Sequence, residues 1–185
     1  MRRNPLCRLL LLLMLGAGAL PVMAGYDDTQ QPIHIEADRA EVDEPRGVMT
    51  YSGHVVLRQG GIQVQADTLV VYSKDGELQR ITAQGQPVRY WQQATGGDAK
   101  TEGTKKEVRG ESQRLEYNTG NKQVLLLGQA EFWQGGNRFS GNRIQYDSAA
   151  ERVIANAGGV KGADGAAPRV SVTLQPRKKK APSSP

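Results

Sequence analysis

Hydrophobic and polar residues alternate along Val48–Tyr72, whose sequence is VMTYSGHVVLRQGGIQVQADTLVVY. Every second residue from Met49 falls on one face, and the alternation resumes at Ile62 after the turn Gln59-Gly60-Gly61. A period of two around a glycine-rich turn is typical of half-buried antiparallel strands. No long stretch beyond the N-terminal segment has a helical period. The pattern therefore predicts an all-β protein built from hairpins.

This hairpin pattern recurs along the chain. IHIEADRAEV, from Ile33, aligns without gaps with IQVQADTLVV, from Ile62, and weaker copies start near Val108 and Arg138. Each copy is followed by a second expected strand that carries a glycine, and these glycines are Gly53, Gly85, Gly128 and Gly158. A two-strand unit that recurs about every 30 residues predicts stacked antiparallel strands, whose neighbouring units bury their apolar faces together.

Each copy also changes register in its middle. Ile62, Val64 and Ala66 share one face, but the apolar positions continue at Leu69 and Val71, with the parity shifted by one residue. A shift of one residue exchanges the two faces of a strand unless a bulge absorbs it. We therefore expect each strand to bend at its Ala-Asp pair and to turn a corner between two sheets.

Polar side chains mark this expected corner in every copy. Asp38 and Asp67 occupy it in the first two copies, and Gln113 and Asn142 take the matching places in the others. Each of these side chains can cap backbone N–H groups that a bend sets free. A catalytic carboxylate pair is the alternative, but glutamine and asparagine cannot perform acid–base chemistry. The replacement pattern favours the structural role.

The N-terminal segment predicts export. Arg2, Arg3 and Arg8 precede or enter a short apolar run, and Val22-Met23-Ala24 offers small residues for cleavage before Gly25. These features are typical of a secretory signal peptide over residues 1–24. The single cysteine, Cys7, lies within it and away from the cleavage site, so we expect neither disulfides nor a lipid-anchor cysteine in the exported chain.

The basic net charge of +5 comes from the two ends of the chain. The signal segment carries arginines and no acid, and Arg177–Lys180 add a second basic cluster, which leaves a slightly acidic body. Nucleic-acid binding, which needs a basic face with interleaved aromatics, is not expected. We expect one domain over residues 25–175 and a disordered basic tail over 176–185, which is either solvated or in contact with anionic head groups.

Two segments interrupt or end the series of strands. Residues 92–107 are polar and lack a period, which predicts a loop insert. Arg169–Gln175 alternates again and predicts a terminal edge strand, with Ile33–Asp38 as the edge strand at the other end. Unpaired edges invite pairing with another chain. Head-to-tail self-association through both ends is the hypothesis, with these candidate interface residues: Ile33, Ile35, Val170, Val172 and Leu174.

The sequence contains no recognisable catalytic constellation. Its two histidines, His34 and His54, both fall on the expected outer face, where they are typically solvent-facing and not metal ligands. No nucleophile motif, phosphate-binding glycine loop or zinc-ligand spacing is present. We therefore predict that the protein is not an enzyme and uses no metal or other cofactor.

Several of these segments together resemble a known family. QPIHIEAD, the Tyr-Ser-Gly-His-Val element followed by QGGIQVQAD, and GQPVRYWQ are similar to the OstA-like family of periplasmic lipopolysaccharide-transport proteins. The resemblance implies an open, twisted β-jellyroll, V-shaped in section, with an apolar interior groove. It also implies binding of the lipid A acyl chains of lipopolysaccharide in that groove.

The same resemblance implies partners and a location. Members of the family join head to tail with copies of themselves, with an LptC-like protein at the inner membrane and with the N-terminal domain of an LptD-like protein at the outer membrane. They thereby bridge the periplasm.

The inner parity of the strands supplies the candidate lipid-binding residues. For any single one of them, ordinary core packing is as good an interpretation as contact with lipid. Ile33, Ile35, Tyr90 and Tyr117 lie where the family's lipid-facing residues are expected. The candidates are Ile33, Ile35, Met49, Tyr51, Val55, Leu57, Ile62, Val64, Tyr90, Tyr117, Leu126, Phe132 and Phe139. Glycines and alanines that lie among the large apolar residues of the inner face suggest spare room in the interior.

Two other classes of protein share parts of this pattern. A β-solenoid scaffold of the cell envelope that binds only proteins would have the same strands around a filled interior. A carbohydrate-active β-helix enzyme would need carboxylates clustered on one face, and the change from aspartate to glutamine and asparagine argues against it.

Overall fold

The structure is a computed structural model that describes residues 31–93, 107–158 and 169–176. Within these residues it contains strands and no helix, and therefore no helix long and apolar enough to cross a membrane. The strands are β1 (Ile33–Glu36), β2 (Arg39–Asp43), β3 (Val48–Gln59), β4 (Ile62–Lys74), β5 (Glu77–Gln92), β6 (Val108–Asn118), β7 (Gln123–Gln134), β8 (Asn137–Asp147), β9 (Arg152–Asn156) and β10 (Ser171–Thr173).

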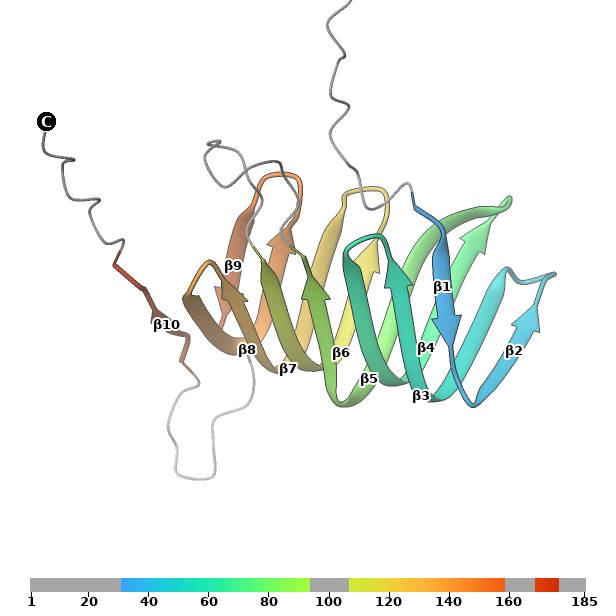
Figure 1. The fold of residues 1–185 in the computed structure, drawn as a ribbon, viewed down its shortest axis with the longest axis horizontal. Coiled ribbons are helices and arrows are strands. Elements are labelled where there is room, and N and C mark those ends of the chain that lie inside the picture. The colour runs from blue at the N-terminus through green and yellow to red at the C-terminus, as the bar shows by residue number, and fades with distance from the viewer. Residues whose placement is uncertain (1–30, 94–106, 159–168, 177–185) are drawn as a thin grey trace, which may run out of the picture.

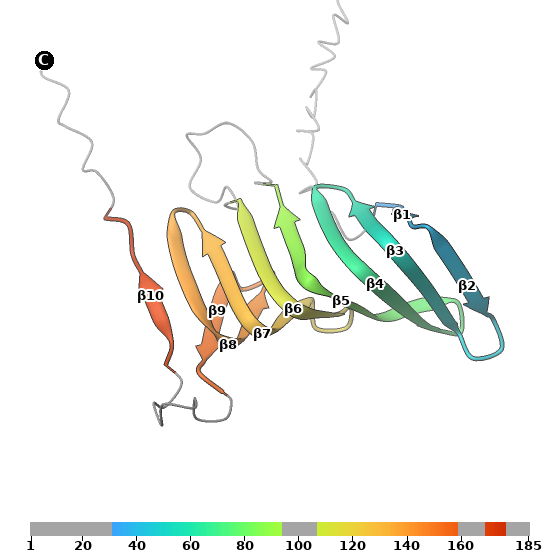
Figure 2. The same cartoon turned by 90° about the horizontal axis from the view of Figure 1, so that it is seen from below.

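All strands belong to one open antiparallel sheet. The order is β1-β3-β4-β5-β6-β7-β8-β10, with β2 also paired to β3 and β9 also paired to β8. From β3 to β8, consecutive strands are neighbours, as expected for a stack of hairpins, and the sheet does not close on itself. Figures 1 and 2 show the strands side by side from β2 at one end to β10 at the other.

A line of register shifts crosses the middle of the sheet. The shifts fall between Ser52 and Val55 in β3, between Gln65 and Thr68 in β4, and at matching places in β5, β6 and β7. The long strands bend there (Figure 1). A bulge turns a strand because the extra residue is left out of the ladder. The bend predicted at each Ala-Asp pair is confirmed, but the two expected sheets are the halves of one continuous sheet.

The corner divides the sheet into two layers. Layer 1 contains β1, β10, the halves of β3, β4, β7 and β8 that meet at the β3–β4 and β7–β8 turns, and the halves of β5 (residues 88–92) and β6 (residues 108–112) that pair between them. Layer 2 contains β2, β9 and the other halves of the long strands. Figure 1 shows the hairpin turns of both layers on the side opposite the corner, which we call the rim.

The glycines of the repeat meet the polar corner residues. A Cβ on Gly53 would collide with the carboxylate of Asp38, and one on Gly128 would collide with the side chain of Gln113. Both glycines have positive φ, +80° and +75°, which a residue with a side chain rarely adopts. Gly158 differs from the prediction, because it follows β9 and is not part of a strand.

The terminal strands are shorter than the sequence suggests. The N-terminal edge is split at the corner into β1 and β2, both paired with β3. The C-terminal edge consists of β9 and of β10, which covers only part of Arg169–Gln175. The predicted signal peptide, most of the predicted insert (94–106) and the basic tail from Arg177 lie outside the described residues, so they stay predictions.

Candidate functional site

The inner face of layer 2 is almost entirely hydrocarbon. Cross-strand pairing arranges most of its inward side chains in two rows that run along the stack, and Ser73 and Leu78 lie one step closer to the rim. The row near the rim is Val42, Met49, Val71, Ile81, Tyr117, Val124, Tyr146 and Val153. The row near the corner is Ala40, Tyr51, Leu69, Ala83, Leu115, Leu126, Ile144 and Ala155. Tyrosine hydroxyls are the only polar groups in the side chains of these two rows.

The inner face of layer 1 carries amides at its rim. Its middle row is apolar and contains Ile35, Leu57, Val64, Tyr90, Gly110, Phe132, Phe139 and Val172. Its rim row is Ile33, Gln59, Ile62, Gln92, Val108, Gln134 and Asn137. Gln59 and Gln92 are nevertheless buried.

Hydrogen bonds stabilise these buried amides, because burying an unpaired amide costs free energy. The Tyr90 hydroxyl donates to Oε1 of Gln92 at 2.9 Å. Nε2 of Gln59 donates to the carbonyl oxygen of Gln31 at 3.0 Å. The rim of layer 1 therefore holds ordered amides beside an apolar strip.

Side chains from the two layers pack tightly against each other. The Phe132 ring, from layer 1, lies 5.0 Å from the Tyr146 ring of layer 2, centroid to centroid. A Cβ on Gly110 of layer 1 would lie 2.8 Å from Cδ1 of Leu126 of layer 2. Leu126 therefore fills the space that the missing side chain leaves. The expectation of spare room at the small residues is wrong at Gly110.

Backbone pairing does not join the layers at the rim. Among the described residues, every ladder links strands that are neighbours within the open sheet, and none runs from the rim of one layer to the other. The layers are therefore held together by the strands that cross the corner and by side-chain contacts. Such an arrangement can open at the rim without breaking a ladder.

All thirteen candidate residues lie in the interior. Val55, Leu57, Val64, Tyr90, Leu126 and Phe132 are buried in the core. The remaining seven are partly buried against that core: Ile33, Ile35, Met49, Tyr51, Ile62, Tyr117 and Phe139. The inside parity predicted from the sequence is thus confirmed for each of them, whereas their binding of lipid stays a prediction.

Large exposed hydrophobic residues gather at the two ends of the stack. Among the described residues they are Val42 on β2, Ile154 on β9, and Val170, Val172 and Leu174 in and around β10. Val172 lies opposite Phe139, so it continues the apolar row of layer 1 to the edge. The interior strip therefore reaches both open ends of the sheet.

The titratable groups of the described residues show no catalytic arrangement. Nδ1 of His54 lies 2.7 Å from Oδ2 of Asp38 on the exposed corner, and this hydrogen bond raises the pKa of His54. Burial raises the pKa of Tyr146 to about 12. His34 and His54 are both exposed, as predicted, and no cluster that could hold a metal ion occurs among the described residues.

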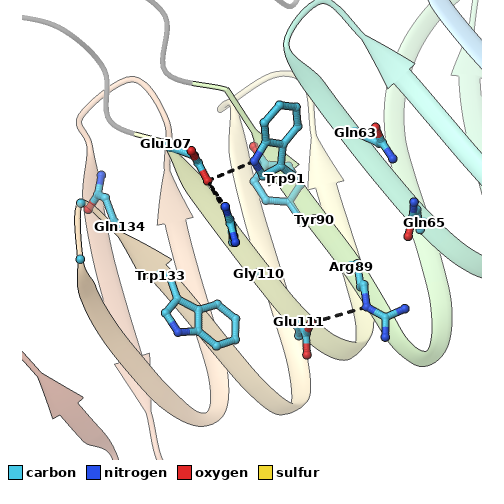
Figure 3. Close-up of a pocket in the computed structure, with 13 residues that line it drawn as sticks. Gln63, Gln65, Arg89, Tyr90, Trp91, Glu107, Gly110, Glu111, Trp133 and Gln134 are labelled. Atoms are coloured by element: carbon cyan, nitrogen blue, oxygen red, sulfur yellow. Dashed lines mark hydrogen bonds and ion pairs between the residues drawn. The ribbon is translucent and has the colours of Figure 1, made fainter. Parts of the chain in front are cut away.

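A hollow of about 850 Å³ lies on the outer face of layer 1. Trp91 and Trp133 line it, together with Gln63, Arg89 and Glu111 (Figure 3). Sequence reasoning did not identify this hollow. The available signal was the repetition of Tyr90-Trp91-Gln92 as Phe132-Trp133-Gln134, each at the end of a strand.

Residues 34–152 match the family model described as LptA/(LptD N-terminal domain) LPS transport protein. The chain belongs to this family. Membership confirms the resemblance seen in QPIHIEAD and the later segments. It also confirms that the protein is not an enzyme, because LptA/LptD-N proteins are transport proteins.

Curated relatives share this assignment. The lipopolysaccharide export system protein LptH of Pseudomonas aeruginosa is 33% identical over 165 residues, which are 88% of this chain and 89% of LptH. LptA of Escherichia coli K12 is 33% identical, over 70% of this chain and 67% of its own length. LptA of Haemophilus influenzae is 32% identical, over 72% and 74% respectively.

A solved structure supports the same fold. LptH of Pseudomonas aeruginosa, described as the LptA-homologous periplasmic component of the conserved lipopolysaccharide transport device, superposes with a TM-score of 0.69. The match has 29% sequence identity and covers 80% of this chain and 99% of LptH. The predicted open β-jellyroll of the LptA/LptD-N family is thus confirmed.

Proposed function

We propose that the protein is a periplasmic carrier that holds the acyl chains of lipopolysaccharide between its two layers and passes them along its length. One observation supports this function above the others. The apolar strip runs through the whole stack and reaches both open ends, where the large exposed hydrophobic residues lie. A carrier needs such a continuous strip, whereas a protein that only fills its own core does not.

The energetics of acyl chains explain why a carrier is needed. Exposing one methylene to water costs about 0.8 kcal/mol, so a chain of about 12 carbons costs roughly 10 kcal/mol. Lipid A carries several such chains. An apolar interior removes most of this cost without covalent chemistry, and the sequence contains no ATP-binding motif that would supply energy locally.

Entry of the lipid requires the layers to separate at the rim. Since the interior is filled by contacts such as Gly110 with Leu126, acyl chains would replace contacts between the layers. The exchange substitutes one apolar contact for another, so its cost in hydrophobic free energy is small. Opening at the rim would also place the amides of Gln92 and Gln134 beside the polar head group of the lipid.

The ends of the stack suit association with similar sheets. Val42 and Val172 are exposed at opposite edges, and no strand of the described residues pairs with the outer side of β2 or β10. Pairing through these edges would extend both the sheet and its apolar strip. We propose head-to-tail contacts with copies of the same chain, with an LptC-like inner-membrane protein and with the N-terminal domain of an LptD-like outer-membrane protein. The assembly would bridge the two membranes.

Photo-crosslinking at neighbouring residues of β1 tests the lipid site. Ile35 faces inward opposite Leu57, whereas His34 is exposed opposite Arg58, so His34 is a matched control on the same strand. In cells that make lipopolysaccharide, a photoreactive residue at position 35 should crosslink to it and one at position 34 should not. No adduct at position 35 in folded, exported protein would reject the lipid site. Equal adducts at both positions would reject the interior as its location.

A charge at the edge tests the association. Leu174→Lys places an ammonium beside β10 and should reduce concentration-dependent self-association, measured by sedimentation velocity. Gln79→Lys adds the same charge at an exposed position of β5, away from both edges, and should leave association unchanged. Self-association that survives in Leu174→Lys would exclude this edge.

A protein-only scaffold remains the second candidate, because the filled interior is what that function predicts. The two candidates differ in one outcome. A scaffold would lose its function in edge variants and give no lipid adduct at position 35. A carrier requires both the edges and the lipid contact.

A further inference from the structure

The outer hollow contains both tryptophans of the chain. The sequence has two, and Trp91 on β5 and Trp133 on β7 both line the hollow. Each lies directly opposite Arg109 of the intervening strand β6. Their backbones are therefore separated by two strand spacings, about 10 Å. Figure 3 shows both rings on the same outer face of layer 1.

Neighbouring side chains support the two rings in place. Nε1 of Trp91 donates to Oε1 of Glu107 at 3.3 Å. The guanidinium of Arg138 lies 5.7 Å from the centroid of the Trp133 ring, a favourable cation–π arrangement. Both tryptophans are half-buried, so part of each indole stays open to a ligand. Two supported aromatic surfaces at a fixed spacing form a platform for flat, partly apolar groups.

The charges in the hollow are paired with each other. Arg109 lies 2.6 Å from a carboxylate oxygen of Glu107, and Arg89 lies 3.5 Å from one of Glu111. The hydrogen bonds from Arg109 and Trp91 lower the pKa of Glu107, which keeps this carboxylate ionised. Each cation in the hollow thus faces an anion, so the hollow has no excess positive charge to attract phosphate. Its paired groups can still hydrogen-bond hydroxyls.

The hollow also adjoins the rim. Its lining includes Gln134, Gly135 and Gly136 at the β7–β8 turn. A molecule whose acyl chains lie between the layers must place the rest of its structure outside, across the rim. The hollow is on the outer side of that rim, within reach of a chain of sugars that leaves the interior.

We propose that this hollow binds neutral sugar residues of lipopolysaccharide, with pyranose rings stacked on Trp91 and Trp133. The C–H face of a pyranose is apolar and packs on the electron-rich face of an indole. The ring hydroxyls would pair with Arg89, Glu111 and the amide of Gln63 at the border of the hollow. This inference rests on the proposed function, because it takes its ligand from the same cargo.

Intrinsic fluorescence provides a direct test, since both tryptophans of the chain lie in the hollow. The probe is the saccharide released from lipopolysaccharide by mild acid hydrolysis, which carries no acyl chains. Titration of the purified protein should produce a saturable change in tryptophan fluorescence. Trp91→Leu and Trp133→Leu each leave one reporter, and each should weaken the apparent affinity about tenfold. Leucine keeps the site apolar, so the loss reports the aromatic surface.

Control variants separate stacking from general destabilisation. Tyr72 lies on the outer face of layer 2, and the guanidinium of Arg80 covers its ring at 4.3 Å. Tyr72→Leu removes a comparable supported ring outside the hollow and should leave saccharide affinity unchanged. Thermal unfolding of each variant verifies that the fold is intact.

Three results would overturn the inference. They are the absence of a saturable change with the saccharide, an affinity that is unchanged in both tryptophan variants, and displacement of the saccharide by inorganic phosphate at equal concentration. The proposed function is tested separately, by displacement of an acyl-chain dye with lipid A. If lipid A displaces the dye while the saccharide fails to bind, only the sugar site is rejected.

Discussion

The two layers share the strand order from β3 to β8 and the same alternation, but their inner faces differ at the rim. In layer 2 the row near the rim, from Val42 to Val153, consists of hydrocarbon and tyrosine side chains, whereas the rim row of layer 1 contains amides such as Gln92 and Gln134. An inward-facing residue is therefore not always a residue of the apolar core. A lipid held between the layers would contact the hydrocarbon side chains of layer 2 on one side and the amide side chains at the rim of layer 1 on the other. The fold is thus suited to an amphipathic cargo.

The largest expected effect comes from removing a contact between the layers. Phe132 is fully buried and its ring packs on Tyr146 of layer 2. Phe132→Ala should lower the free energy of unfolding by about 3–5 kcal/mol, because it leaves a cavity between the layers. Chemical denaturation measures the loss. Phe139→Ala removes a partly buried ring nearer the edge and should cost less. Equal losses would show that Phe132 has no special role in joining the layers.

Alkaline pH tests the apolar character of layer 2. Burial raises the pKa of Tyr146 to about 12 from its ordinary value near 10. Between these pH values the folded protein keeps a phenolic proton that the unfolded chain loses, so stability should fall as pH rises. The full shift corresponds to at most about 3 kcal/mol.

Chemical denaturation of the natural chain and of Tyr146→Phe, each at pH 9 and near pH 12, isolates the contribution of the Tyr146 hydroxyl. The phenylalanine variant lacks the group and should lose less stability over the same range. An identical pH dependence in both proteins would contradict the proposed burial effect.

A smaller effect is expected at the amide rim of layer 1. Gln92→Leu makes this position resemble the rim of layer 2, but it removes the acceptor at 2.9 Å from the Tyr90 hydroxyl. The free energy of unfolding should fall by about 1 kcal/mol. Tyr90→Phe in the same chain should recover part of the loss. The neighbouring Gln93 is exposed, and Gln93→Leu should be close to neutral. A neutral Gln92→Leu would show that this hydrogen bond contributes little.

The smallest expected effect on stability comes from the exposed pair Asp38 and His54 at the corner, which belongs to neither layer. Asp38 raises the pKa of His54 through a hydrogen bond and through its charge. The raised pKa implies a stabilising contribution that is complete at low pH and is lost as pH rises through the folded pKa. Because the pair is exposed, stability should change little. An NMR titration should show a lower His54 midpoint in Asp38→Asn than in the natural chain, and an unchanged midpoint would exclude the pair in solution.

Much of this architecture could be predicted from the sequence. The alternation assigned Ile35 inward and His34 outward, and the parity shift after Ala66 indicated the corner, because both follow from local backbone geometry. The contact of Gly110 with Leu126 could not be predicted, since it depends on which residue the opposite layer presents. The outer hollow could not be predicted for a related reason. It depends on the cross-strand register that brings Trp91 and Trp133 to one face.

The open strand order has a consequence for the evolution and engineering of the fold. Among the described residues, each strand pairs only with strands beside it in the stack, so the molecule behaves as a one-dimensional array whose cross-section is independent of its length. Inserting or deleting one two-strand repeat of about 30 residues would change the length by about 10 Å without rebuilding the remainder. The span of the protein is thus a quantity that gene duplication can adjust in steps.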